Sequence, residues 1–288
     1  MTKRLIAAAI AVICAIAAYS DEMPEKCRIN FNDTTRTYRM YMPEGLEKGA
    51  PLCLYIHGYS SHGRWVADLN AAADRHGYAI CYPDGLPDSK GKEGWNVGYP
   101  TQYNMGDDVA FIKALVAEVC RKFDLDTENV FVTGSSNGGD IIYQMLYTEP
   151  DIFKAYASVA GLTFCNVFLN NRLTRPVPLM EIHGTGDKVS MWDGDPGNTG
   201  GWGPYVSVPV AVGAVAANNR CQSYRKEDVV TRPEATHKVI RHLYTDSPSG
   251  CDVELYELED APHSWHSKDI DTGEIVLSFF DRYRTRKQ

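Results

Sequence analysis

Short apolar runs alternate with stretches of helical periodicity along this chain, and that alternation constrains its fold more than any other feature. The apolar runs cover 37–42, 51–57, 78–82, 129–134, 177–183, 238–244 and 252–258. Helical periodicity covers 65–75, 107–123, 138–147, 207–218 and 274–284. Most of the short runs are apolar throughout, as in strands covered on both faces. The alternation predicts an α/β fold with a mostly parallel central sheet flanked by helices.

The ends and loops suggest how the chain is divided. Lys3 and Arg4 precede an apolar run from Leu5 to Ala18, which is typical of a secretory signal peptide over 1–20. The alternative, a membrane anchor, needs about 20 apolar residues, more than this run offers. Two loops rich in Gly, Pro and Asp, 84–106 and 192–205, interrupt the alternation, but no linker separates two regions. We expect a secreted protein, extracellular or periplasmic, with a single catalytic domain over 21–288.

Charge and cysteine content exclude several classes of partner. The net charge is −8, and Lys and Arg do not cluster before the last few residues. Nucleic acids and anionic membranes attract basic patches, so we expect neither as a partner, and no stable membrane association after signal cleavage. Without the signal peptide seven cysteines remain, an odd number and without a C-x-x-C pair. This favours one or two disulfides over a zinc site, and we predict no metal.

A short glycine-rich turn supplies the main chemical signal. The apolar run 129–134 leads into Gly134-Ser135-Ser136-Asn137-Gly138, and a helical stretch follows. This is the G-x-S-x-G pattern in the strand–turn–helix context of an α/β-hydrolase, where the turn exposes the serine hydroxyl above the sheet. The alternative is an ordinary turn in which Ser136 caps the helix. We interpret Ser136 as a catalytic nucleophile.

A serine hydroxyl needs a base to remove its proton and a carboxylate to orient that base. In this architecture the acid and then the histidine follow the serine along the chain. Asp187 follows the run 177–183, and His263 follows the run 252–258. Asp187 could instead serve a turn, and His266 is the alternative base. Order and position favour Asp187 as the acid and His263 as the base.

Two backbone amides are expected to stabilise the oxyanion. One belongs to the residue after the nucleophile, Asn137. The other comes from the loop after an earlier strand, where His57-Gly58-Tyr59 stands, so we predict the amide of Tyr59. Tryptophans that could stack on a substrate ring lie in the loops near these groups: Trp95, Trp192, Trp202 and Trp265. The alternative is that some of them pack loops, above all Trp95.

Several longer segments occur in this chain in the order found in one group of enzymes. They include YIHGYSS, LNAAADRHGYAICYPDG, GWNVG, GDDVAFIKALV, VFVTGSSNGGD, IHGTGDKV and HSW. The chain resembles carbohydrate esterase family one, which groups feruloyl and acetylxylan esterases with polyhydroxybutyrate depolymerases, from about 37 to 280. The resemblance implies the same triad and oxyanion hole, no cofactor, and a disulfide between Cys221 and Cys251.

Together these features predict a secreted serine esterase that acts through an acyl-enzyme. The expected substrate is an ester-decorated polysaccharide or a small ester, and we expect a feruloyl or acetylxylan esterase active on plant cell walls. Three alternatives stay open at this point: a polyhydroxybutyrate-type polyester depolymerase, a serine peptidase of the same fold, and a carbohydrate-binding relative without catalysis.

Overall fold

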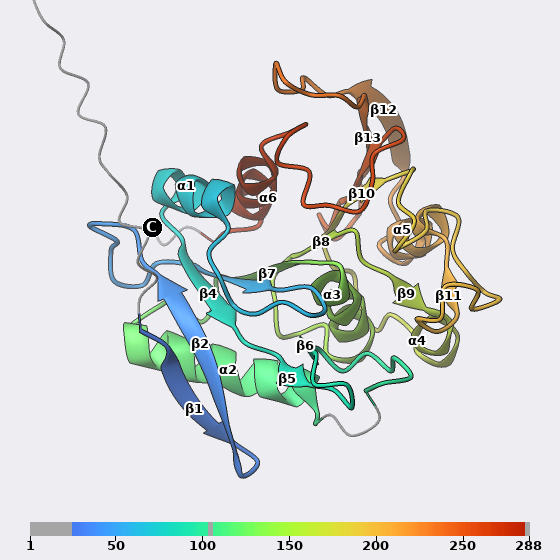
Figure 1. Cartoon of the computed structure of the whole chain (residues 1–288). Helices are drawn as coiled ribbons and strands as arrows, with labels where there is room; N and C mark the ends of the chain where they lie inside the picture. Colours follow the sequence, from blue (N-terminus) through green and yellow to red (C-terminus); the bar gives the residue numbers. More distant parts are fainter. Residues whose placement is uncertain (1–24, 103–105, 286–288) are drawn as a thin grey trace, which may run out of the picture.

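A ten-stranded sheet forms the centre of the molecule in the computed structural model, which describes residues 25–102 and 106–285 (Figure 1). The strand order is β1-β2-β4-β3-β7-β8-β10-β14-β13-β12. The strands are β1 (Cys27–Phe31), β2 (Thr34–Tyr41), β3 (Leu52–Ile56), β4 (Ala79–Pro83), β7 (Val130–Ser135), β8 (Tyr156–Val159), β10 (Leu179–Gly184), β12 (Ser223–Asp228), β13 (Val239–Thr245) and β14 (Val253–Leu258). From β4 to β14 neighbours pair in parallel, and the outer strands pair antiparallel. The predicted α/β-hydrolase fold with a mostly parallel central sheet is confirmed.

Helices cover both faces of this sheet (Figure 1). On one face α1 (Ala67–His76) packs against α6 (Thr272–Asp281). On the other face lie α2 (Asp108–Phe123), α3 (Asn137–Thr148) and α5 (Val208–Asn218), and the short α4 (Cys165–Asn170) packs beside α3. Two small hairpin-like pairs complete the fold: β5 (Leu86–Pro87) with β6 (Glu93–Gly94), and β9 (Thr163–Phe164) with β11 (Tyr205–Val206).

Strand β3 shows why the predicted runs are apolar at every position. All five of its residues are buried. Leu52 and Leu54 enter the core beneath α2, α3 and α5, whereas Cys53 and Tyr55 enter the core beneath α1 and α6. Successive side chains of a strand point to opposite faces, so a strand covered on both sides has no position for a polar residue.

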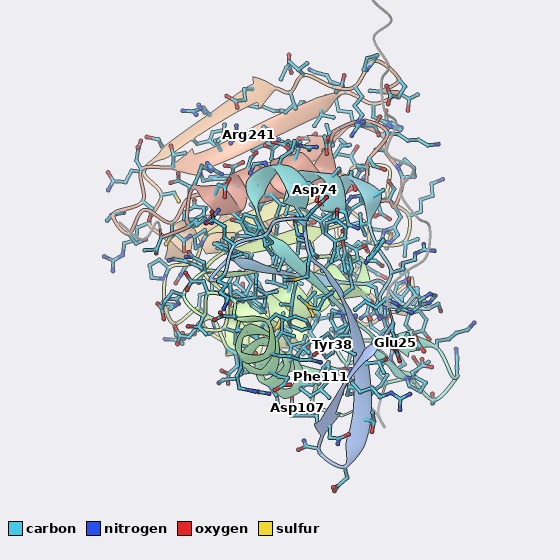
Figure 2. All side chains as sticks on the ribbon, turned by 90° about the vertical axis from the view of Figure 1, so that its left-hand side faces the viewer. Glu25, Tyr38, Asp74, Asp107, Phe111 and Arg241 are labelled. Atoms are coloured by element: carbon cyan, nitrogen blue, oxygen red, sulfur yellow. The ribbon has the colours of Figure 1, made fainter. Side chains whose placement is uncertain are left out.

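The β1–β2 hairpin is fixed to the rest of the molecule by α2. Figure 2 shows Tyr38 of β2 and Phe111 of α2 side by side in this region, and both are fully buried. The guanidinium of Arg36, also on β2, donates to Asp108 at 2.8 Å. The second carboxylate oxygen of Asp108 accepts from the amide of Asn96 at 2.8 Å. This buried ion pair therefore also holds the loop that follows β6.

Three strands of the ten-stranded sheet, β1, β8 and β12, were not predicted from the sequence. Strand β8 has only four residues, and β1 has an alternating burial pattern at the sheet edge. Every residue of β12 is exposed, so it has no apolar pattern to recognise. The predicted signal peptide lies outside the described residues. Within 25–102 and 106–285 no helix has the length and apolar character needed to cross a bilayer.

Candidate active site

The turn between β7 and α3 holds Ser136 in a conformation that few non-glycine residues adopt. Its φ is 55° and its ψ is −124°, and its N–H donates to the carbonyl of Val159 on β8 at 2.9 Å. Such backbone strain persists only where the surrounding structure enforces it, and it is common at active sites. Here this backbone conformation directs the side chain of Ser136 out of the strand and into the mouth of a pocket.

Close packing explains why glycines flank this serine. A Cβ on Gly134 would lie 2.6 Å from the carbonyl oxygen of Ile56, and a Cβ on Gly138 would lie 2.0 Å from the same oxygen. Both distances are far below van der Waals contact. The two glycines let β7 and α3 approach the end of β3, where the loop with Gly58 and Tyr59 begins.

Asp187 follows β10 and uses both carboxylate oxygens. One oxygen accepts from the N–H groups of Val189 and Ser190 at 2.8 and 2.9 Å. The other lies 2.6 Å from Nδ1 of His263. Burial works against ionisation of this group, but the hydrogen bond and charge of His263 and the amide of Val189 outweigh it and lower the pKa of Asp187. A carboxylate held in this way is a hydrogen-bond acceptor in a fixed position next to the ring of His263.

The loop after β14 carries both candidate bases, and their surroundings differ. His263 is partly exposed and faces Asp187. His266 is 2% exposed, and its Nε2 has no hydrogen-bond partner among the described residues. Burial lowers the pKa of His266 to about 4. The geometry therefore favours His263 over His266 as the candidate base, and its catalytic role stays a prediction.

A buried ion pair lies behind the acid. Nδ1 of His183 lies 2.9 Å from Glu181, and its Nε2 lies 2.8 Å from the carbonyl of Ser190. Both nitrogens face acceptors, an arrangement that favours the protonated form of the ring. Burial opposes this charge, but Glu181 outweighs it and raises the pKa of His183. Sequence reasoning missed Glu181, although a lone acidic residue inside an apolar strand is a usable signal.

Two backbone amides predicted to form the oxyanion hole lie beside Ser136. Within the part of the chain that the structure describes, neither the N–H of Tyr59 nor that of Asn137 donates to a protein acceptor. The loop with Tyr59 is fixed by His57, whose Nδ1 donates to the Gly58 carbonyl at 2.8 Å and whose Nε2 accepts from the Gly85 amide at 2.9 Å. Burial lowers the pKa of His57 to about 4, so this ring is neutral at pH 7.

Our prediction that Trp95 contacts substrate is wrong. Its side chain is 0% exposed, and its indole N–H donates to the carbonyl of His57 at 2.9 Å. The side chain of Asn137 holds its backbone, since Oδ1 accepts from the Trp95 amide at 2.7 Å and Nδ2 donates to its carbonyl at 3.1 Å. Trp95 therefore packs beneath the oxyanion loop, which is the alternative role considered for it, and cannot stack on a substrate.

A pocket of about 190 Å³ opens at Ser136. Its lining includes Ser136, His263, Tyr59, Tyr99, Leu162 and Trp202, together with residues 189 and 190 of the acid loop. The rings of Tyr59, Tyr99 and Trp202 lie within 5.8 Å of one another, centre to centre. The hydroxyl of Tyr99 donates to the buried Asp140 at the start of α3. Aromatic side chains thus form one wall of the pocket beside Ser136.

The remaining two tryptophans lie away from this pocket. The ring centre of Trp192 is 6.1 Å from that of His183, so Trp192 covers the buried ion pair. Trp265 donates its indole N–H to Asp68 at 3.0 Å and lines a neighbouring cavity of about 500 Å³. Of the four tryptophans predicted to contact substrate, Trp202 is therefore the one that lines the pocket containing Ser136.

The predicted disulfide is not formed in the structure. All seven cysteines of the described residues are free thiols, including Cys221 and Cys251. The two are neighbours, because Sγ of Cys221 lies 3.8 Å from the carbonyl oxygen of Cys251, but their sulfur atoms are not bonded. In the part of the chain that the structure describes, no three His, Cys, Asp or Glu side chains form a group that could hold a metal ion.

Comparison with known proteins identifies relatives of this chain. The family model described as "Esterase PHB depolymerase" matches residues 36–193. "Putative esterase NocK" of Nocardia uniformis subsp. tsuyamanensis is 30% identical over 86% of this chain and 76% of its own length. A "Bifunctional acetylxylan esterase/xylanase XynS20E" of Neocallimastix patriciarum is 26% identical over 54% of this chain. A "Feruloyl esterase B" of Talaromyces stipitatus is 28% identical over 47% of it.

The last two matches cover only part of those relatives, 22% of XynS20E and 39% of the feruloyl esterase. Among solved structures, an acetyl xylan esterase from Aspergillus awamori matches with a TM-score of 0.63 and 16% identity, over 90% of this chain and all of that one. At this identity the structural match supports the fold alone.

Proposed function

Since the chain belongs to the PHB depolymerase esterase family and is a carboxylic ester hydrolase, we propose that it is a secreted serine esterase that removes feruloyl or acetyl groups from plant cell-wall polysaccharide. The observation that supports this most directly is the shared pocket of Ser136 and His263, with Nδ1 of His263 2.6 Å from Asp187. The three groups come from the ends of three different strands of one sheet.

In the proposed reaction His263 takes the proton of Ser136 as its oxygen attacks the ester carbonyl. Asp187 keeps the imidazole in one tautomer, with the proton on Nδ1, and stabilises the imidazolium that forms. His263 then protonates the departing alcohol, which leaves an acyl group on Ser136. Water activated by the same histidine hydrolyses this acyl-enzyme, and no cofactor takes part.

The amides of Tyr59 and Asn137 are the proposed donors to the negatively charged oxygen of each tetrahedral intermediate. Preorganised donors of this kind stabilise the transition state more than the substrate, because the charge develops only there. His57 and Trp95 support these donors from beneath, one through the Gly58 carbonyl and the other through the side chain of Asn137. Both side chains are buried and fix the loop from within the protein.

The dimensions of the pocket favour a small acyl group. A volume of about 190 Å³ with Tyr59, Tyr99 and Trp202 in its wall suits an acetyl group or one phenolic ring. The names of two relatives, an acetylxylan esterase and a feruloyl esterase, point to the same two acyl groups. The family name favours a second candidate, a polyester of hydroxyalkanoate units.

Replacing the nucleophile tests the mechanism. Ser136→Ala should lower kcat/KM for 4-nitrophenyl acetate by about 10⁴-fold or more, because the variant lacks the hydroxyl that is proposed to form the acyl-enzyme. Ser278→Ala, which changes an exposed serine of α6, should keep wild-type activity. Thermal melting of both variants should match that of the wild type. Substantial activity of folded Ser136→Ala would refute the proposed nucleophile.

Product analysis tests the substrate. The mature protein is incubated separately with feruloylated, acetylated arabinoxylan and with polyhydroxybutyrate, and acids released are measured by chromatography. Release of ferulate or acetate supports a polysaccharide esterase and shows which of the two acyl groups it takes. Release of hydroxybutyrate instead would favour the polyester candidate.

A further inference from the structure

A second and larger cavity adjoins the nucleophile on the other side of the oxyanion loop. Its volume is about 500 Å³, and its lining includes Gly58 and Ser135. A Cβ on Gly58 would lie 3.3 Å from Cβ and 3.8 Å from Oγ of Ser136. Gly58 is therefore in close contact with Ser136, and through Gly58 and Ser135 this cavity lies beside the proposed nucleophile.

The lining of this cavity, which we term the basic pocket, is aromatic and basic. Tyr55, Trp65 and Trp265 provide its rings, and Arg64 and His62 provide its nitrogen donors. None of its lining residues is acidic, although the whole chain has 37 acidic and 29 basic residues. Arg64 thus brings a positive charge to the lining of this pocket in a chain that is acidic overall.

The guanidinium of Arg64 is available for a ligand. Arg64 is exposed, and among the described residues it has no ion pair or hydrogen bond. The nearby carboxylate of Asp68 is engaged elsewhere, since both of its oxygens accept from the Trp265 indole at 3.0 Å and one also accepts from the Leu69 amide. Arg64 therefore keeps its donors without an internal acceptor.

We propose that the basic pocket binds a carboxylate on one half of the ester substrate, with Arg64 as its partner. A guanidinium matches a carboxylate with two parallel hydrogen bonds, and the aromatic walls suit the flat faces of a ring that bears the carboxylate. This inference rests on the proposed function, because it assumes that Ser136 is the reacting group. The carboxylate could belong to the acyl half or, as a uronic acid, to the sugar half.

Matched pairs of substrates separate these two sources. The acyl pair is 4-nitrophenyl hydrogen glutarate and its neutral carboxamide. The sugar pair is an acetylated xylo-oligosaccharide with a glucuronic acid branch and the same molecule with that acid reduced to glucose. The measured quantity is the ratio of kcat/KM for the charged member to that for the neutral member. In the wild type we expect a ratio above one in one pair, and a lower ratio when salt screens the interaction.

The variant Arg64→Gln should lower that ratio about fivefold, since it removes one partly exposed charge-assisted contact, and Arg64→Lys should retain part of it. Arg28→Gln is the matched control, because Arg28 is exposed on β1 at the far edge of the sheet and should leave the ratio unchanged. A ratio at or below one in both pairs, or one that Arg64→Gln leaves intact, overturns the inference. Failure to hydrolyse any of the neutral esters would instead count against the proposed function.

Discussion

At the scale of single residues, the site depends on groups that hold other groups in place. Asp187 fixes His263 with one oxygen and its own loop with the other. His183 lies behind it, with Nε2 3.6 Å from Asp187, and is itself paired with Glu181. These contacts hold the carboxylate of Asp187 in place, and through it the ring of His263. The proposed proton transfer would thus depend on several buried polar side chains.

Asp187→Asn separates the two functions of this carboxylate. The amide oxygen of Asn can still accept from Val189 and Ser190, so the loop should keep its shape. Its NH₂ group would face Nδ1 of His263 and favour the wrong tautomer, which should lower kcat roughly 10³- to 10⁴-fold. Kinetics with 4-nitrophenyl acetate, beside a thermal melt, measures both effects. Retention of more than a tenth of wild-type kcat would show that Asp187 is not the orienting acid.

At the scale of secondary-structure elements, the site depends on how closely β7 and α3 approach β3. Strand β7 ends in the turn of Ser136, and β3 ends in the loop with Tyr59, so the separation of these strands sets the position of the proposed nucleophile relative to the proposed oxyanion donors. Gly134 and Gly138 permit this approach because a side chain at either position would meet the backbone of Ile56. The two glycines of the pattern G-x-S-x-G are therefore needed for close packing against β3 as well as for the turn.

Gly138→Ala should be more harmful than an ordinary glycine substitution. Its Cβ would lie 2.0 Å from a backbone oxygen that cannot rotate away, so α3 must shift, at a cost of about 2 kcal/mol or more. Gly213→Ala is the control, because Gly213 lies within α5 with no atom near its missing Cβ. It should stabilise the protein by about 0.5–1 kcal/mol. Urea unfolding measures both, and equal stability of the two variants would contradict this account.

The elements themselves were largely predictable from sequence, because each carries a local pattern. All seven predicted strands and all five predicted helices are present, with ends that differ by a few residues. The missed β12 pairs with β13 although all its side chains face solvent. Its pairing uses backbone hydrogen bonds, which every sequence can form, so composition gives no sign of it.

At the scale of the whole molecule, the fold brings distant strand ends to one edge of the sheet. Ser136, Asp187 and His263 follow strands β7, β10 and β14. These strands are parallel to one another, and β8 lies between β7 and β10. The same compact arrangement buries His57 and His266, each 2% exposed. Their pKa values fall to about 4, chiefly because of burial, so the folded state holds both rings neutral where the unfolded state would protonate them.

Protonation of these two rings should therefore make the fold less stable in acid. Because the folded pKa of about 4 lies below the usual 6.5, the unfolded state binds more protons at each ring between these values. Their contribution to the free energy of unfolding then falls as pH falls through that window, by about 3 kcal/mol for each ring at most. His266→Gln should flatten the fall between pH 7 and 4.5 in urea titrations. If this variant shows the same pH dependence as the wild type, His266 is ruled out as a source of the loss of stability in acid.

The sequence by itself determined the alternation of strands and helices, the turn that presents Ser136, and the chain order in which Asp187 and His263 follow it. These features are local, since each depends on residues within one run or one turn. Only the tertiary structure decided that Trp95 is buried while Trp202 reaches the pocket, that Glu181 supports His183, and that Arg64 lines a cavity beside Gly58. Such facts depend on which side chains from distant segments share a space, and local patterns in the sequence do not record that.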